Sequence, residues 1–328
     1  CHALAVVRAI QDTWPEARIT WIIGKTEASL LADIPGIEFI IFDKSEGRSA
    51  YRSLAGKLSS TKFDVTLCMH ASMRVNRIYR MLNSPIKLGF DRRRARDFQW
   101  LFTNQRIEPK ANQHVLDGMM SFARHIGVPD RALRWDIPLA ESHRAFARQH
   151  VGDRPALIIS PCSTQRSRNF RNWSIENYAA AAKYARNHYD CAIVLTGGPT
   201  PLEKDYGLGI ADLCGPDTIN LIGKTSLKEL LAVLATGTAL ICPDSGPAHM
   251  ATTVGTPVIG LYATSNPART GPYLSQNLVV NAYADAAGRF LGKTPDQLRF
   301  GQRIRDPRAM DLIRLKDVNR KIDDVFTR

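Results

Sequence analysis

The chain has 328 residues, of which 44% are hydrophobic and 23% are charged, and these proportions are typical of water-soluble globular proteins. Its length predicts two domains of about 150 residues each. The net charge is +13 and no apolar run approaches the roughly 20 residues that cross a bilayer, so the composition excludes a membrane-spanning chain and favours a soluble protein with an anionic partner.

Cysteine and histidine usage gives no sign of a disulfide framework or a metal site. The six cysteines are scattered without a Cys-x-x-Cys pair, and the eight histidines do not cluster with them at ligand spacing. Several cysteines lie within apolar stretches, where cysteine usually acts as a small hydrophobic residue. The pattern therefore favours a reducing cytoplasm and predicts no zinc site.

The first half alternates short apolar runs with helical patterns. It begins inside one such pattern, CHALAVVRAIQDTW, without a capping residue, so we expect a first strand and a loop to precede Cys1. Strands are predicted at RITWII, EFIIF, FDVTLC and PIKLGF, with helices near 26–33, 49–60, 72–82 and 112–127. Buried strands of this length separated by helices are typical of βαβ units with a parallel sheet.

The composition turns polar near residue 150, in ESHRAFARQHVGDRP, where we expect a linker. The predicted domains are therefore 1–150 and 151–328. The first carries 23 Lys and Arg against 15 Asp and Glu, and it includes the arginine cluster FDRRRARDF. Such a cluster fits a solvated loop, an anionic membrane surface, an anionic substrate or nucleic acid.

The second half repeats the alternation more regularly. Strands are predicted at ALIIS, DCAIVLTGG, TINLIG, TALIC and PVIGLY, and helices at WSIENYAAAAKYARNHY, LEKDYGLGIADLCG, SLKELLAVLATG and LKDVNRKIDDVF. Ser174 is a predicted N-cap, and Ser226 with Glu229 forms a capping-box pattern. Together the halves predict two doubly wound α/β domains in tandem.

The loops that follow the second-half strands are the candidate site, because open parallel sheets bind ligands at the carboxyl ends of their strands. SPCSTQRSRNFRNW offers the hydroxyls of Ser160, Ser163 and Thr164, with Arg171 just before a helix. Hydroxyls and a guanidinium at a helix start suit a phosphate, although a solvated basic loop is the alternative. In TGGPTPLEK, Glu203 can accept hydrogen bonds from ribose hydroxyls, but TGG also forms plain turns.

Two further loops complete this edge. GKTS at 223–226 resembles the end of a P-loop but lacks the upstream glycine, so P-loop hydrolysis is not expected. In DSGPAHMATTVGTPVIGLY, Ser245 and Gly246 present a hydroxyl and backbone N–H groups at a helix start, whose dipole favours phosphate. Asp244 is predicted to orient neighbouring groups and His249 to donate to an anionic ligand, with a purely structural histidine as the alternative.

Four polar loops on one sheet edge predict a nucleotide-diphosphate pocket. The chain contains no Asp-x-Asp pair to hold a divalent metal on a sugar nucleotide. We therefore expect Arg171, helix dipoles and hydroxyls to neutralise the diphosphate, with no metal and no cofactor.

The segment DSGPAHMATTVGTPVIGLYATSNPARTGPY resembles the signature of glycosyltransferase family 9, the heptosyltransferase-like enzymes that build the inner core of bacterial lipopolysaccharide from ADP-heptose. The resemblance continues through ALAVVRAIQDTWPEARITWIIG, LGFDRRRARDF, HVLDGMMSFARHIGVP and RNWSIENYAAAA, and so covers nearly the whole chain. It implies the GT-B architecture, two facing Rossmann-like domains with parallel sheets and a cleft between them. The acceptor would bind to 1–150 and the nucleotide sugar to 151–328, and the reaction would invert the anomeric centre without a metal.

The resemblance also assigns site residues. When the hydroxyls of the loop after the first strand of the second half are included, the expected donor-binding residues are Ser163, Thr164, Arg171, Glu203, Asp244, Ser245, Gly246 and His249. The expected acceptor-binding residues are Arg74, Arg92, Arg93 and Arg94. The family's general base is an aspartate just before the segment that matches Cys1, so no catalytic base is assigned within the chain. His70 stands where many members have glutamine, which indicates a different acceptor.

The implied protein is cytoplasmic and monomeric, and makes peripheral contact with the cytoplasmic face of the inner membrane. Its implied partners are a nucleotide sugar and the anionic lipopolysaccharide core on lipid A. Nucleic acid is not expected, since the chain has no helix-turn-helix or RNA-binding signature. Three alternatives stay open: a sugar-nucleotide 2-epimerase of GT-B fold, a family member that uses another nucleotide sugar, and a non-catalytic module that binds anionic lipid or nucleic acid.

Overall fold

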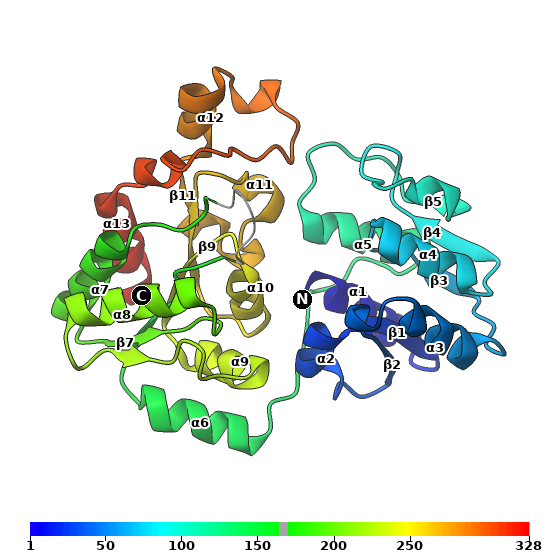
Figure 1. The fold of residues 1–328 in the computed structure, drawn as a ribbon, viewed down its shortest axis with the longest axis horizontal. Coiled ribbons are helices and arrows are strands. Elements are labelled where there is room, and N and C mark those ends of the chain that lie inside the picture. The colour runs from blue at the N-terminus through cyan, green and yellow to red at the C-terminus, as the bar shows by residue number, and fades with distance from the viewer. Residues whose placement is uncertain (164–169, 328) are drawn as a thin grey trace. The chain divides into compact units, whose positions relative to one another are not determined.

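The computed structural model describes residues 1–163 and 170–327, and the chain divides into two compact units, Cys1–Ile137 (unit 1) and Pro138–Arg328 (unit 2) (Figure 1). Each unit alternates strands with helices, and every strand pairing among the described residues is parallel. The α/β class with parallel sheets, predicted from the alternation of apolar runs, is confirmed.

Unit 1 contains two separate sheets. The first pairs β1 (Ile19–Gly24) with β2 (Ile37–Phe42), and the second has the order β3 (Val65–Leu67), β4 (Ile86–Gly89), β5 (Gln105–Arg106). The helices are α1 (His2–Thr13), α2 (Lys25–Leu31), α3 (Arg48–Leu58), α4 (Met73–Met81) and α5 (Val115–His125), with short 3-10 turns η1 (Lys44–Glu46) and η2 (Gln99–Leu101). All four predicted strands form, whereas the two-residue β5 is too short to give a pattern in the sequence.

Unit 2 is built on one six-stranded sheet in the order β11-β10-β9-β6-β7-β8. Its strands are β6 (Ala156–Ile159), β7 (Ala192–Leu195), β8 (Ile219–Asn220), β9 (Ala239–Pro243), β10 (Val258–Tyr262) and β11 (Val280–Asn281). Its helices are α6 (Glu141–Val151), α7 (Ile175–Tyr189), α8 (Pro201–Cys214), α9 (Leu227–Thr236), α10 (Gly246–Thr253), α11 (Pro267–Thr270), α12 (Tyr283–Leu291) and α13 (Leu315–Phe326), with 3-10 turns η3 (Tyr273–Leu278), η4 (Pro295–Gln297) and η5 (Ala309–Leu312).

The strand order of unit 2 reverses between β6 and β9. From β6 the chain adds β7 and β8 on one side, and from β9 it adds β10 and β11 on the other. The loops that leave the carboxyl ends of β6 and β9 therefore diverge, and a crevice opens at such a switch point in doubly wound sheets. The fold thus directs attention to the loops that carry Arg171 and Asp244.

The polar stretch that the sequence indicated as a linker is instead a helix. In α6, Ala147 and Val151 are buried and lie on one face, which packs against α9. Lys228 of α9 donates from Nζ to the Pro138 carbonyl at 2.6 Å and ties the start of this segment to unit 2. The two units accordingly divide after Ile137 and not near residue 150.

Helix caps set the starts of the unit 2 helices much as the sequence predicts. The Ser226 and Glu229 capping box is present, with Ser226 N donating to Glu229 Oε2 at 2.7 Å and Glu229 N donating to Ser226 Oγ at 3.2 Å. Ser174 caps α7 by accepting from Asn177 N. Gly237 ends α9, and a Cβ at this position would collide with the side chain of Ile158 in β6. The glycine therefore permits close packing of the helix end on the sheet.

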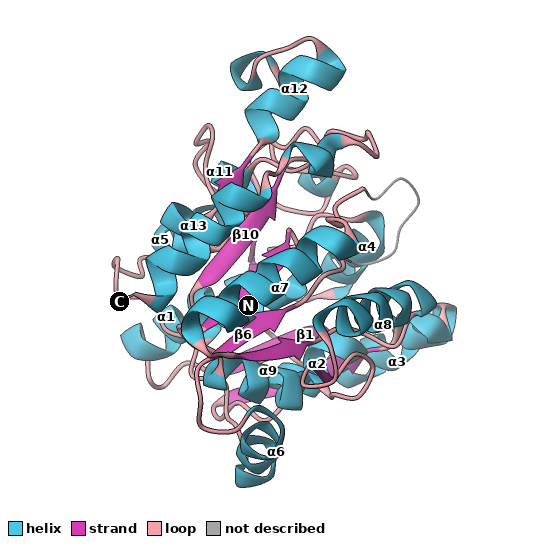
Figure 2. Cartoon of the chain, turned by 90° about the vertical axis from the view of Figure 1, so that its left-hand side faces the viewer, coloured by secondary structure: helices cyan, strands magenta, loops and turns pink. Residues whose placement is uncertain are grey.

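The core of unit 2 lies between its sheet and helices α7 and α13, which lie side by side (Figure 2). Trp173 and Tyr178 are fully buried there and meet edge to face, with ring centroids 5.4 Å apart. Tyr189 at the end of α7 donates to Asp323 of α13 at 2.6 Å, so the last helix belongs to this core.

Candidate functional site

Asp244 lies at the switch point of unit 2, immediately after β9, and only 7% of it is exposed. Ser265, from the loop after β10, donates its hydroxyl to Asp244 Oδ2 at 2.7 Å. Arg171, from the segment after β6, donates through Nη1 to the Asp244 carbonyl at 2.6 Å and to Oδ2 at 3.2 Å. The carboxylate therefore gathers groups from three loops, which fits its predicted role in orienting its neighbours.

Arg171 is held by buried anchors on its own segment. Two residues on, Trp173 donates its indole Nε1–H to the Ile313 carbonyl at 3.2 Å from inside the core. Next to it, Asn172 accepts from the Ser163 backbone N–H at 3.0 Å, which fixes the other end of the loop. The Arg171 side chain is 12% exposed, so its guanidinium is a partly buried cation opposite a buried carboxylate.

Arg303, which no pattern in the sequence indicated, also approaches this carboxylate. Its Nη2 is 3.9 Å from Asp244 Oδ2, and its side chain is 47% exposed. The segment FGQRIRDPR that carries it joins the loop after β10 through a hydrogen bond from Ile304 N to the Thr264 carbonyl. The side chain of Arg269 in α11 lies against the same segment. A Cβ at Gly301 would be only 3.0 Å from the Arg269 Nε atom. These segments are far apart in the sequence and meet through contacts between loops, so no local pattern could reveal them.

The first turn of α10 supplies a second group of candidates. Ser245 is the N-cap residue, but its side chain makes no capping hydrogen bond. Its hydroxyl is buried beside the buried Cys242 thiol and makes no hydrogen bond to any nitrogen or oxygen atom among the described residues. Gly246 is exposed, and a Cβ there would meet nothing within 4 Å. Backbone N–H groups at an uncapped, accessible helix start favour an anion.

His249 lies one turn into α10 and is half-buried. Its Nδ1 is shielded from solvent. The structure thus places it on the same short helix as Ser245 and Gly246, as predicted, and one turn from the helix start.

The cysteine and tyrosine side chains around the site are kept neutral by burial. Burial raises the pKa of the Cys242 thiol well above its usual range, against the smaller opposing effect of a hydrogen bond with Ser245. Burial likewise raises the pKa of Tyr262. Burial, with a smaller contribution from the charge of Glu203, raises the pKa of Cys162 to about 12. At neutral pH these groups are protonated, so they add no negative charge that would repel a phosphate.

Glu203 lies in the first turn of α8, and its carboxylate stabilises the loop that joins β7 to this helix. Oε1 accepts from Gly198 N at 2.7 Å and Oε2 accepts from the Thr200 hydroxyl at 2.6 Å. Thr200 in turn caps α8 by accepting from Glu203 N. Each carboxylate oxygen keeps a further lone pair for a ligand hydroxyl, so a ribose contact would be added to this structural role.

The remaining donor-loop predictions have different outcomes. Ser163 is buried and faces Asn172. Ser160, also buried, shares a hydrogen bond with the Thr196 hydroxyl at 2.7 Å, which joins β6 to β7. Thr164 lies outside the described residues.

The predicted acceptor arginines follow β3 and β4 of unit 1. Arg74, in the first turn of α4, is exposed, as are Arg92 and Arg93 after β4. Arg94 instead points inward: its Nε pairs with Asp91, its Nη1 donates to Gln113 Oε1 at 2.6 Å, and its Nη2 donates to the Glu108 carbonyl at 2.9 Å. Three of the four are therefore accessible, whereas Arg94 stabilises the loop.

His70 lies at the carboxyl end of β3, and its backbone is clamped. Tyr79 both accepts from His70 N at 3.2 Å and donates to the His70 carbonyl at 2.8 Å. Burial raises the pKa of Tyr79 well above its usual range, so this clamp is neutral. The His70 side chain itself is exposed, on the same sheet edge as Arg74.

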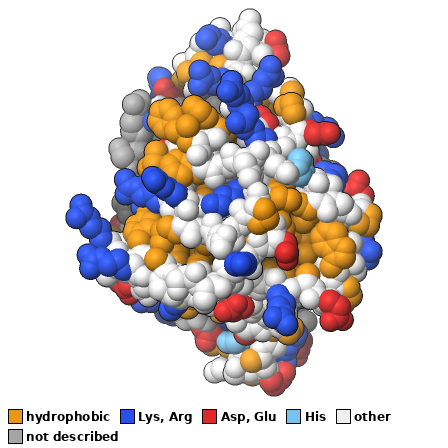
Figure 3. Space-filling view, turned by 90° about the vertical axis from the view of Figure 1, so that its right-hand side faces the viewer, with side chains coloured by type: hydrophobic (Ala, Val, Ile, Leu, Met, Phe, Trp, Pro, Cys, Tyr) orange, Lys and Arg blue, Asp and Glu red, His pale blue; other side chains and the backbone are white. Residues whose placement is uncertain are grey.

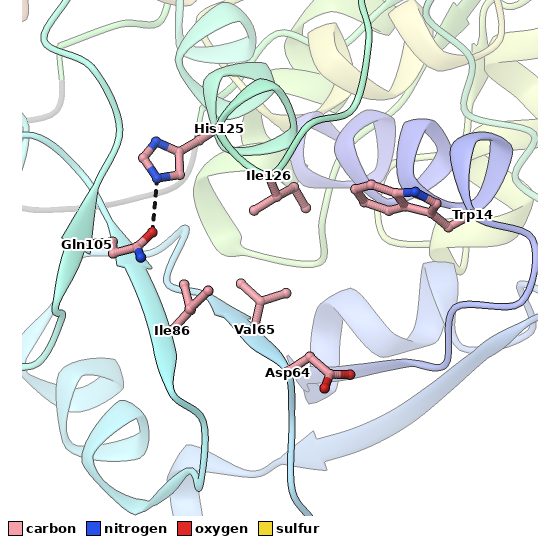
Figure 4. A pocket seen from close by; sticks show the side chains of 7 residues that line it. All are labelled: Trp14, Asp64, Val65, Ile86, Gln105, His125 and Ile126. Atoms are coloured by element: carbon pink, nitrogen blue, oxygen red, sulfur yellow. Dashed lines mark hydrogen bonds between the residues drawn. The ribbon is translucent and has the colours of Figure 1, made fainter.

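A small cavity of about 270 Å³ lies at the opposite edge of this sheet (Figure 4). Val65, Ile86 and Gln105 line it from the amino ends of β3, β4 and β5, and Gln105 Oε1 lies 3.1 Å from His125 Nε2 at its rim. None of the predicted site residues lines it, so the cavity is separate from the candidate chemistry.

Metal ions and the membrane were considered from the sequence, and two features of the described residues concern them. No group of three or more His, Cys, Asp or Glu side chains among them is arranged to hold a metal ion. Within the same residues, no helix has the length and apolar character that crossing a bilayer requires.

Comparison with known proteins defines the class. Residues 51–292 match the model of glycosyltransferase family 9 (heptosyltransferase). The chain therefore belongs to this family and is a glycosyltransferase, as the signature segment predicted.

Individual relatives agree with this assignment. The chain is 39% identical to the lipopolysaccharide core heptosyltransferase OpsX of Haemophilus influenzae, over 97% of this chain and 91% of that protein. Among solved structures it resembles a family 9 glycosyltransferase from Veillonella parvula, with a TM-score of 0.80 at 20% identity, covering 99% of this chain and 93% of that one. It also resembles the E. coli heptosyltransferase WaaC with ADP, with a TM-score of 0.75 at 17% identity, covering 98% and 95%. At these identities the structural likeness shows the fold, which is GT-B.

Proposed function

We propose that this glycosyltransferase transfers heptose from ADP-heptose to the inner core of lipopolysaccharide, without a metal ion. Family membership and the 39% identity to a lipopolysaccharide core heptosyltransferase support the sugar and the acceptor. A structural neighbour that carries ADP supports the nucleotide. The observation that carries the proposal is the cluster of Arg171, Asp244 and Ser265 at the switch point, beside the uncapped start of α10.

The donor site would act by stabilising the departing diphosphate. As the glycosidic bond breaks, negative charge grows on the phosphate oxygens, and groups already oriented toward them lower the barrier. Arg171 supplies a fixed cation, held by the buried carboxylate of Asp244. The N–H groups and hydroxyl at Ser245 and Gly246, with His249 one turn further on, would supply further donors. These groups would take the place of a divalent cation.

The acceptor would bind to unit 1 through its exposed cations. Arg74, Arg92 and Arg93 follow two neighbouring strands at one edge of a sheet. Guanidinium groups suit the phosphates and carboxylates of an inner core. Since Arg94 already bonds within the unit, we assign it the support of this loop.

The test is transfer measured with donor and acceptor together and with donor alone. We expect ADP release only when an inner-core acceptor is present, with no effect of EDTA. ADP-heptose at 100 times its Kd should stabilise the protein by about 2.7 kcal/mol, whereas UDP- and GDP-sugars should not. Arg144, an exposed residue of α6, offers a control variant, Arg144→Ala, that should behave as the parent.

Two results would contradict the proposal. Conversion of the donor in the absence of acceptor would indicate an epimerase. Loss of transfer on removal of divalent ions would show that a metal and not Arg171 neutralises the diphosphate.

A further inference from the structure

The guanidinium of Arg303 lies at the candidate donor site and donates no hydrogen bond to any of the described residues. Its Nη2 is 3.9 Å from Asp244 Oδ2, which is too long for a hydrogen bond. The same oxygen already accepts from the Ser265 hydroxyl at 2.7 Å and from Arg171 Nη1 at 3.2 Å. Arg303 is therefore held beside the carboxylate by charge alone, and its N–H donors are left for another acceptor.

The charges of this cluster do not cancel. Asp244 pairs with Arg171 at 3.2 Å, so these two side chains offset each other and the charge of Arg303 is left over. The neighbouring Cys242 and Tyr262 do not offset it, because burial raises the pKa of both groups and keeps them protonated. The cluster therefore has a net positive charge, which attracts an anion.

Hydrogen bonds on both sides of Arg303 fix its backbone. The Gln302 carbonyl accepts from the hydroxyl of the buried Tyr283 at 2.8 Å. Ile304 N donates to the Thr264 carbonyl at 3.0 Å, and the Ile304 side chain is buried in the core of unit 2. The backbone that carries Arg303 is thus attached to the loop after β10, so its side chain approaches the site from a fixed position.

The side chain of Arg303 is accessible to a ligand, since 47% of it is exposed. The segment between α12 and η5 also carries other exposed cations: Lys293, Arg299, Arg305 and Arg308. Lys and Arg side chains gather at the end of unit 2 that carries α12 (Figure 3). Among the described residues, however, Arg171 and Arg303 are the two cations within ion-pair distance of the Asp244 carboxylate. The position beside Asp244, and not the abundance of cations, distinguishes Arg303.

We propose that Arg303 binds the diphosphate of the nucleotide sugar, as a second cation beside Arg171. This inference rests on the proposed function, because it adds a residue to the donor site. A planar guanidinium can donate to two phosphate oxygens at once, and a cation without a paired carboxylate gains more from an anion than a paired one does. Arg303 lies beyond residues 51–292, which match the family model, so the contacts in this structure, and not the family signature, assign it.

The experiment measures ADP binding to the full chain by calorimetry, for the parent and for matched variants. Arg303→Gln removes the charge and should weaken ADP binding about tenfold, the scale of one half-exposed hydrogen bond to a charged group. Arg303→Lys keeps the charge without the planar fork and should weaken binding only about threefold. The control Arg305→Gln alters an exposed arginine two positions along the same segment and should bind ADP as the parent does.

Adenosine binding and the Tm separate a contact with phosphate from a structural role. Adenosine has no phosphate, so Arg303→Gln should bind it as the parent does. The Tm of this variant should change by less than about 2 °C, as expected for an exposed side chain without a hydrogen bond. Unchanged ADP affinity in Arg303→Gln would overturn the inference. An equal loss in Arg305→Gln, or a parallel loss of adenosine binding, would overturn it as well.

The parent protein alone tests the proposed function. Tighter binding of UDP or GDP than of ADP would refute ADP-heptose as the donor. The ratio of variant to parent affinity, measured with that nucleotide, would still decide the role of Arg303, because all three nucleotides contain the diphosphate. A parent that binds none of the three would overturn both the proposed function and this inference.

Discussion

Replacing Arg171 by alanine, Asp244 by asparagine, and both together tests the central pair of the donor site. In the parent these side chains meet at 3.2 Å with exposures of 12% and 9%. Arg171→Ala leaves a buried carboxylate with Ser265 as its close donor and the half-exposed Arg303 at 3.9 Å. The double variant removes both charges, so it lacks this uncompensated group.

The size of the coupling free energy between Arg171 and Asp244 follows from the distance between their charges and from their burial. Opposite charges 3.2 Å apart attract by about 5 kcal/mol at an effective dielectric constant of about 20. The cost of removing both groups from water offsets more than half of this attraction. We therefore expect a coupling of about 2 kcal/mol, so that the double variant is less destabilised than the sum of the single variants by that amount.

Thermal unfolding and donor kinetics measure the two roles separately. A loss of 2 kcal/mol corresponds to a Tm decrease of about 4–8 °C for a domain of 150–250 residues. Arg171→Ala should also reduce transfer roughly 10- to 1000-fold, the range for losing one charge-stabilising donor. The double variant should regain stability but not activity.

Either of two outcomes refutes this reasoning. Additive Tm changes would mean that the two side chains do not interact in solution. Recovery of activity in the double variant would mean that Arg171 serves only to neutralise Asp244 and does not contact the donor.

Three further predictions concern the surroundings of the site. Trp173→Ala should destabilise the protein by about 3–5 kcal/mol in denaturant unfolding, since the indole is fully buried and donates a hydrogen bond to the Ile313 carbonyl. Tyr206 of α8 is only half-buried, so a smaller loss in Trp173→Ala than in Tyr206→Ala would contradict this. Glu203→Gln should weaken stability by about 1 kcal/mol and raise the KM for donor, because it disturbs the contact with Gly198; an unchanged KM would remove Glu203 from the donor site. The hydrogen bond to Asp323 raises the pKa of Tyr189 from its ordinary value of 10 to about 12. The stability it contributes is fully present below pH 10 and is lost as the pH rises toward 12, so Tyr189→Phe should flatten this alkaline part of the unfolding profile.

The secondary structure was predictable because local rules decide it. The strands of unit 2 are short apolar runs bounded by polar or glycine-rich turns, and the cap of α9 follows from Ser226 and Glu229 alone. The helix α6 was missed because its buried face consists of Ala147 and Val151 within a strongly charged stretch. Composition suggested a linker there, although the spacing of four residues was that of a helix face.

The site was predictable only as a set of loops. Arg171 and Asp244 each follow a strand, but their contact depends on β6 lying next to β9. The order of strands in a sheet cannot be predicted from a local sequence pattern. Arg303 was missed because its segment reaches the site only through a contact with the distant loop after β10. The engagement of Glu203 with its own loop had a visible signal, since Thr200 and Glu203 have the spacing of a capping box.

The direction in which a side chain points was the other feature that the sequence could not predict. Arg92, Arg93 and Arg94 are identical in type and consecutive, yet only Arg94 points inward, because Asp91 lies three residues before it and Gln113 lies within reach. A run of like charges predicts a basic surface but not which members serve the fold.

The contact between α7 and α13 has a consequence for how the protein is made. Tyr189 and Asp323 are separated by 134 positions, and a ribosome adding 5–20 residues per second needs roughly 7–27 s to travel between them. During that interval the strands β7 to β11 are synthesised one after another, and the helix α13, which packs against α7, is made only after all of them. A chaperone that shields those strands on the ribosome should therefore raise the yield of this protein far more than one supplied after release.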